Sequence, residues 1–168
     1  MSGCSDDIPD YYKKPTLVLC CGNVLFGDDG FGPAVAAALQ KSEIPEGVYV
    51  MHAGIRARDI LFPLLLGGSR VRKLIIVDAV HLPTRKRTCG EIFELPLDDI
   101  PQVKIDDFSM HQVPSSNLLR ELRDHRNVNV IVLACQIKNI PDRVAPGLSE
   151  PVQAAIPRMC ALVAQHWR

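Results

Sequence analysis

The sequence predicts a three-layer α/β/α domain with a mostly parallel central sheet of about five strands. Short runs of consecutive apolar and β-branched residues recur along the chain, and such runs are typical of strands buried on both faces. Segments with helix-start residues separate these runs, which indicates strands joined by crossover helices. The 168 residues are enough for one such domain with a substantial core.

The first half of the chain is expected to supply three strands and two helices. The first strand is Thr16–Cys21, in which almost every residue is apolar. A glycine-rich loop follows, and Pro33 suits the first turn of the next helix because its fixed φ is already helical. Gly47–His52 is the second strand, Asp59–Leu66 a helix that its proline kinks or bounds, and Lys73–Val77 the third strand.

The second half is expected to add a short edge strand, a last buried strand and two helices. Gly90–Leu95 alternates apolar and polar residues, as an edge strand does. A helix over Leu118–Arg123 can be capped by a preceding serine, and Asn129–Cys135 is the last buried strand. The final helix begins after Ser149, with a proline in its first turn, and runs to about Trp167.

The chain is expected to form one domain over residues 15–168, since it contains no internal repeat, linker or low-complexity segment. Residues 1–14 are polar and acidic, and we expect a flexible or loosely docked N-terminal arm there. This arm lacks the apolar core of a signal peptide. No apolar run reaches the roughly 18 residues of a membrane-spanning helix.

Charge and cysteine content exclude several classes of function. Lys+Arg and Asp+Glu number 19 each, so the net charge is zero. Nucleic acids and anionic membranes bind basic surfaces, and we therefore expect neither as a partner. The six cysteines contain no Cys-x-x-Cys pair, which argues against a zinc cluster. Cys20, Cys21 and Cys135 fall in apolar runs and are expected to be buried free thiols in a cytoplasmic protein.

Acidic residues follow two of the expected strands at their carboxyl ends, where open parallel sheets bind ligands. Asp28 and Asp29 lie in the first loop among four glycines. The spacing fits neither phosphate-binding glycine motif, and two carboxylates repel an anion, so a cation is the better ligand. Capping a helix explains one acid but not both. Asp78 directly follows the third strand, where it either pairs with a helix end or an arginine, or has a function.

A histidine would complete a metal site, but the residues alone do not choose among His52, His81 and His111. Two carboxylates with one imidazole suit zinc, nickel, cobalt or iron better than magnesium. With three protein ligands, coordination positions stay open for substrate or water. The residues therefore predict an open, acidic, metal-responsive site at the edge of the sheet.

Four segments of the chain resemble the hydrogenase maturation endopeptidases. They are GNVLFGDDGFGPAVAAAL at 22–39, Val77–Ala79, the S-x-H-Q element Ser109–Gln112 and the G-L-S-x-x-V segment Gly147–Val152. The first is long and specific, the four occur in family order, and together with their flanking strands they span residues 16–155.

The resemblance implies that Asp29, Asp78 and His111 form both the catalytic and the metal-contacting site. It implies an aspartic-type endopeptidase that removes the C-terminal extension of a nickel–iron hydrogenase large-subunit precursor after nickel insertion. The expected partner is that nickel-loaded precursor. The nickel belongs to the substrate, and no tightly bound cofactor of the enzyme itself is expected. A weak site of two oxygens and one nitrogen would contact the ion without removing it from soft thiolates.

One segment departs from the family pattern. Many members have a D-G-G-T-like turn after the second strand, where this chain has His52–Ile55. Together with Cys135–Lys138, this segment resembles the branch that serves the deazaflavin (coenzyme F420)-reducing hydrogenases of methanogenic archaea.

Two other functions would use the same residues. A non-catalytic nickel chaperone would have the same three ligands but would leave the mass of the precursor unchanged. A receiver-type signalling domain also has an acid pair, an Asp after its third strand and a Lys after its fifth, here Lys138. Its acid pair follows the first strand directly, whereas six residues, 22–27, intervene here. Strong Mg-dependent phosphorylation of Asp78 would identify a receiver.

Overall fold

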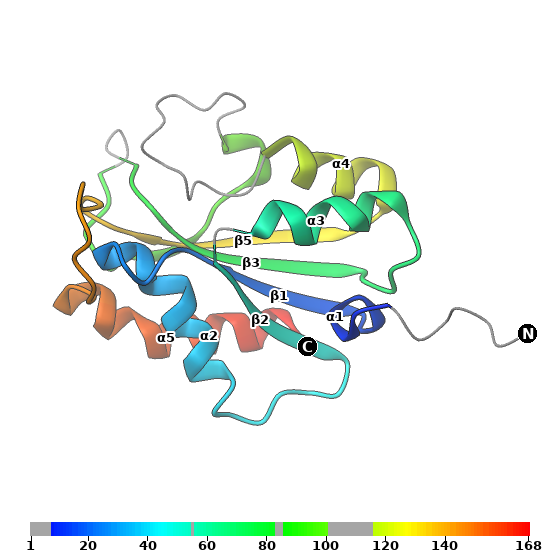
Figure 1. Ribbon diagram of the computed structural model, residues 1–168, viewed down its shortest axis with the longest axis horizontal. Coiled ribbons are helices and arrows are strands. Elements are labelled where there is room, and N and C mark those ends of the chain that lie inside the picture. Colours follow the sequence, from blue (N-terminus) through cyan, green and yellow to red (C-terminus); the bar gives the residue numbers. More distant parts are fainter. Residues whose placement is uncertain (1–7, 55, 83–85, 101–115) are drawn as a thin grey trace, which may run out of the picture.

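The computed structural model describes residues 8–54, 56–82, 86–100 and 116–168. These residues form a five-stranded sheet with helices on both faces, which confirms the predicted architecture (Figure 1). The strands are β1 Thr16–Cys21, β2 Val48–Gly54, β3 Lys73–Val80, β4 Ile92–Glu94 and β5 Asn129–Gln136, in the order β2-β1-β3-β5-β4. The first three of these and β5 are parallel, and β4 runs antiparallel to β5.

Two helices cover each face of the sheet (Figure 1). Helices α2 and α5 pack on one face, and α3 and α4 on the other. The helices and 3-10 turns are α1 Asp10–Lys13, η1 Gly27–Gly30, α2 Phe31–Leu39, α3 Ala57–Leu66, η2 Leu97–Asp99, α4 Ser116–Arg126 and α5 Glu150–His166. Helix α3 continues through Pro63, which the sequence had marked as a kink or a boundary.

The two faces of the sheet have separate apolar cores because side chains alternate along each strand. Leu17 and Leu19 of β1 point toward α3 and α4, while Val18 and Cys20 point toward α2 and α5. All four are fully buried. Burying a side chain of the size of leucine stabilises the fold by about 1.5–3 kcal/mol, so these continuous apolar runs commit β1 to the centre of the sheet.

The described part of the predicted N-terminal arm docks on the domain. Helix α1 buries Tyr12, whose hydroxyl donates a hydrogen bond of 2.8 Å to the carbonyl oxygen of Ile60 in α3. Burial raises the pKa of Tyr12. Tyr12 was therefore the signal in this polar segment that residues 8–14 dock on the domain.

The structure also bears on the predicted thiols and on membrane-spanning helices. Cys20, Cys21 and Cys135 are buried free thiols, as predicted. None of the described helices combines the length and apolar character that crossing a bilayer requires.

Candidate active site

Asp78 lies inside β3, whereas the sequence placed it just after the strand. The strand continues to Val80 because its pairing with β5 continues, with Asp78 opposite Ala134. The side chain is fully buried. Its Oδ1 accepts a hydrogen bond of 2.8 Å from the amide of Ala79, while Oδ2 is buried and has no hydrogen-bond partner among the described residues.

The surroundings of Asp78 favour its neutral form. Burial raises the pKa of Asp78 well above the usual carboxyl value, and the negative charge of Asp29 raises it further. The hydrogen bond from Ala79 acts in the opposite direction and is weaker. A carboxyl group that is buried, incompletely bonded and close to a second acid is typical of functional sites.

Asp29 reaches this position through the first loop, which folds tightly onto the end of β1. A Cβ at Gly32 would lie 1.9 Å from the carbonyl oxygen of Cys21, and one at Gly22 would lie 2.0 Å from the carbonyl oxygen of Asp29. Gly22 also has φ +133°, which disfavours other residues. The glycines therefore allow close packing of the start of α2 against β1 and of η1 against β3, and they bring fully buried Asp29 to the site. Asp29 Oδ2 accepts a hydrogen bond of 3.0 Å from the main-chain N–H of Asn23.

Asp28 points to a different part of the molecule. Its Oδ1 accepts a hydrogen bond of 2.6 Å from the amide of Ser149, and its Oδ2 accepts one of 2.8 Å from the hydroxyl of the same residue. Ser149 is the N-cap residue of α5, so Asp28 places a carboxylate at the positive end of that helix. The sequence allowed that one acid of the pair caps a helix, and it is the last helix that Asp28 caps.

Several known proteins share the sequence pattern and the fold of this chain. Residues 33–166 match the family of hydrogenase maturation proteases. The chain belongs to this family. A Methanocaldococcus jannaschii protein, provisionally named a hydrogenase maturation protease, is 35% identical over 153 residues, which cover 90% of this chain and 95% of that protein.

Two more relatives extend the comparison to a named subunit and to a solved structure. The coenzyme F420 hydrogenase subunit delta of Methanothermobacter thermautotrophicus is 34% identical, with 90% of this chain and 94% of that protein covered. The hydrogenase maturating endopeptidase HybD of Escherichia coli has the same fold, with a TM-score of 0.65, 26% identity and 88% of each chain covered. The family resemblance, including its methanogen branch, is confirmed, and the receiver alternative is not supported.

The histidine of the candidate site stays a prediction, because His111 lies outside the described residues. Of the two competing histidines, His52 is exposed on the edge strand β2. His81 follows β3, and its Nδ1 lies 3.1 Å from the carbonyl oxygen of Ile137. Within the described ranges, no three His, Cys, Asp or Glu side chains are grouped as metal ligands. The structure therefore brings together Asp29 and Asp78, but neither His52 nor His81 with them.

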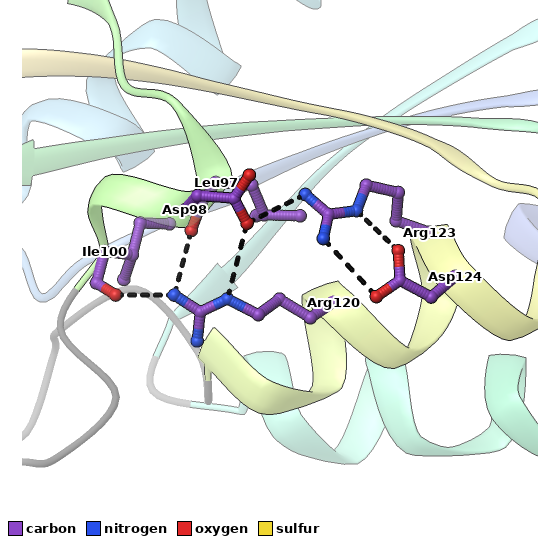
Figure 2. Close-up of polar contacts among 6 residues, drawn as sticks. All are labelled: Leu97, Asp98, Ile100, Arg120, Arg123 and Asp124. Atoms are coloured by element: carbon purple, nitrogen blue, oxygen red, sulfur yellow. Dashed lines mark hydrogen bonds and ion pairs between the residues drawn. The ribbon is translucent and has the colours of Figure 1, made fainter.

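The elements on either side of the His111 segment in the sequence are held to each other (Figure 2). Arg120 of α4 donates hydrogen bonds of 3.1 and 2.7 Å to the carbonyl oxygens of Leu97 and Ile100. Arg123 forms an ion pair of 3.1 Å with Asp98. These contacts fix η2 against α4, on the face of the sheet where Leu74 and Ile76 of β3 lie and where alternation along the strand also places Asp78.

One cysteine of the protease lies next to the acid pair without adding a strong metal ligand. The pKa of the Cys21 thiol is raised well above its usual value, mainly by burial and then by the charge of Asp78. The thiol therefore stays protonated, and a protonated thiol is a poor ligand. The described donors at the site are the carboxyl oxygens of Asp29 and Asp78.

Reasoning from the sequence missed the partner of Asp28. Ser149 is 121 residues away, and its segment was read only as the start of the last helix. A weak signal was present, because a serine before an acidic residue and a proline is a helix start that can accept a carboxylate partner.

Proposed function

We propose that this protease removes the C-terminal extension of a nickel–iron hydrogenase large-subunit precursor after nickel insertion, and that Asp29, Asp78 and His111 contact the nickel of that precursor. The observation that supports this proposal is the buried Oδ2 of Asp78, which has no partner among the described residues and lies beside a second acid. An unpartnered buried carboxyl oxygen costs free energy unless a cation or donor is supplied. A metal ion on the substrate would supply it.

The chemistry of the donor set suits an ion that the enzyme contacts but does not keep. Two carboxyl oxygens and one imidazole form a site of moderate affinity for nickel, while the neutral Cys21 thiol adds no soft ligand. The precursor can therefore retain its ion during the encounter. We expect no tightly bound cofactor in the free enzyme.

The proposed reaction is hydrolysis of one peptide bond with an aspartic-type mechanism. One carboxylate of the pair acts as general base and accepts a proton from water as the water oxygen attacks the peptide carbonyl. The carbon–nitrogen bond then breaks and the departing amine takes up a proton. The precursor loses its extension and leaves with a new carboxyl terminus. Free buried thiols at Cys20, Cys21 and Cys135 support a reducing, cytoplasmic setting for this step.

Mass spectrometry of a precursor incubated with the protein tests the proposal. The precursor of the hydrogenase large subunit encoded in the same genome is prepared with nickel and without it. We expect the nickel-loaded form to become shorter at its C-terminus and the nickel-free form to keep its mass. A nickel chaperone would leave both masses unchanged. Cleavage of the nickel-free precursor at full rate would refute the sensing role.

A further inference from the structure

A concave site lies at the carboxyl end of the sheet, where β3 also places Asp78. It is a pocket of about 320 Å³ at the ends of β3 and β5, and its polar lining includes His81, Lys86, Arg87, Gln136 and Lys138. None of the described residues that line it is acidic. In a chain with no net charge, the ammonium groups of Lys86 and Lys138 at one pocket attract an anion, whereas the charge of Arg87 is offset by its ion pair with Glu91.

Gln136 gives the pocket a hydrogen-bond acceptor that is already oriented. The residue is only 4% exposed. Its Nε2 donates a hydrogen bond of 2.9 Å to the carbonyl oxygen of Ile137, but its Oε1 has no partner in the described part of the chain. Buried polar atoms without partners are uncommon, so this oxygen points to a ligand that donates an N–H or O–H.

Arg87 gives the pocket a hydrogen-bond donor that is also already oriented. Its Nη1 donates a hydrogen bond of 2.6 Å to Glu91, and its guanidinium carbon lies 3.7 Å above the ring of Phe93. Its Nε is buried and has no hydrogen-bond partner among the described residues. The pocket therefore presents one acceptor and one donor, with the ammonium groups of Lys86 and Lys138 as exposed cations around them.

The pocket and the acid pair are close to each other in the direction of the strands. Asp78 pairs with Ala134 and Val80 with Gln136, so Gln136 lies two residues beyond Asp78 in the register. Side chains alternate, so Gln136 is on the same face as Asp78. Two residues of strand span about 7 Å, which is the length of two residues of an extended peptide.

We propose that this basic pocket binds a carboxylate on the C-terminal extension of the precursor, two to three residues from the bond that is cut. The inference rests on the proposed function and names the substrate feature that the site recognises. The carboxylate accepts a hydrogen bond from Arg87 Nε and pairs with Lys86 and Lys138. The main-chain N–H beside it donates to Gln136 Oε1. An inorganic anion such as sulfate carries no N–H and would leave Gln136 unmatched.

The carboxylate has two possible sources, and precursor variants separate them. In one series, each Asp or Glu two to three residues after the cut is changed to Asn or Gln. In the other, a Gly-Ser pair is added at the end of the chain, which moves the terminal carboxylate away from the pocket. We expect one series, and not the other, to lower kcat/KM by about tenfold.

Charge reversal in the enzyme tests whether the pocket is responsible. Lys86→Glu and Lys138→Glu change exposed residues, and Lys41→Glu is a matched reversal near the opposite edge of the sheet. We expect the two pocket variants to raise KM by about tenfold on the unchanged precursor and to have no effect on the neutralised one. Equal losses on both precursors, or an equal loss in Lys41→Glu, would overturn the inference.

Failure of the proposed function gives a different result from failure of this inference. If the wild-type protein never shortens the precursor, the proposed function is wrong. The pocket is then judged by fluorescence anisotropy with a synthetic peptide of the precursor extension. About tenfold weaker binding to Lys138→Glu than to wild type supports the pocket, and equal binding to both rejects it.

Discussion

Asp28 and Asp29 follow one another in the chain, but Asp28 enters the cap of α5 and Asp29 enters the site of Asp78, and the carboxyl groups of Asp28 and Asp78 are bonded to different extents. Both oxygens of Asp28 accept hydrogen bonds from Ser149 at the start of α5. Asp29 faces β3 beside Asp78, whose Oδ2 has no partner in the described structure and whose pKa is raised. The cap of α5 is complete without a ligand, whereas the acidic site has unmet bonding capacity. Complete bonding indicates a role in stability, and incomplete bonding in a buried carboxyl indicates function.

The largest effect that this comparison predicts is on activity. Asp29→Ala and Asp78→Ala, with His111→Ala as the expected third, should each lower processing of nickel-loaded precursor by about 10³-fold or more, because each removes a group at the reacting centre. Circular dichroism should show that the variants stay folded.

The neighbouring acid provides the matched control for those variants. Asp28→Asn keeps one acceptor for Ser149, so its processing rate should stay within a few-fold of wild type. Loss of activity in Asp28→Asn together with retained activity in Asp29→Asn would show that the roles of the two acids are reversed.

The next largest effect is a loss of stability, and we expect it where Asp28 caps α5. Asp28→Ala removes two charge-assisted hydrogen bonds and the negative charge at the start of the 17-residue helix α5. We expect the free energy of unfolding to fall by about 2–3 kcal/mol, measured by urea denaturation. Ser149→Ala, which loses only the hydroxyl bond, should cost about 1 kcal/mol. An unchanged urea midpoint in Asp28→Ala would mean that Asp28 does not stabilise the fold.

The sequence predicted the layers of the fold better than the limits of its site. Apolar runs such as Thr16–Cys21 identify buried strands, because a strand that is covered on both faces is apolar at nearly every position. The same rule ended the third strand before the acidic residue Asp78, although pairing with β5 extends β3 to Val80 and buries Asp78. Hydrogen bonds between strands do not depend on the side chain, so composition could not show this.

The sequence also could not predict contacts between segments that are far apart in the chain. The glycines of the first loop marked an unusual turn, but only the position of Cys21 shows why Gly32 needs to be small. The partner of Asp28 lies 121 residues away, and no local pattern links the two. The choice of Asp29 and His111 over their alternatives came from family resemblance, and the roles of both residues stay predictions.

The last predicted effect reverses the usual sign of a mutation in a buried site. Because burial and Asp29 raise the pKa of Asp78, the folded protein binds a proton at pH values where the unfolded chain has released it. Stability is therefore lost as the pH rises from the unfolded carboxyl pKa, about 3.9, through the raised pKa of the folded state. Asp78→Asn has no proton to lose and avoids this cost. At pH 7 and without precursor, we expect the variant to be more stable by about 1–2 kcal/mol, which corresponds to roughly 2–8 °C in Tm.

The pH dependence distinguishes this cause from a general packing effect. The difference in urea midpoint between Asp78→Asn and wild type should disappear below about pH 4, where Asp78 is protonated in both the folded and the unfolded state. Asp28→Asn should not gain stability at any pH, since its carboxylate is fully bonded. If Asp78→Asn is no more stable than wild type at pH 7, then donors to Oδ2 already offset its burial. Asp78 would then be bonded as completely as Asp28, and the two regions would not differ in the way described above.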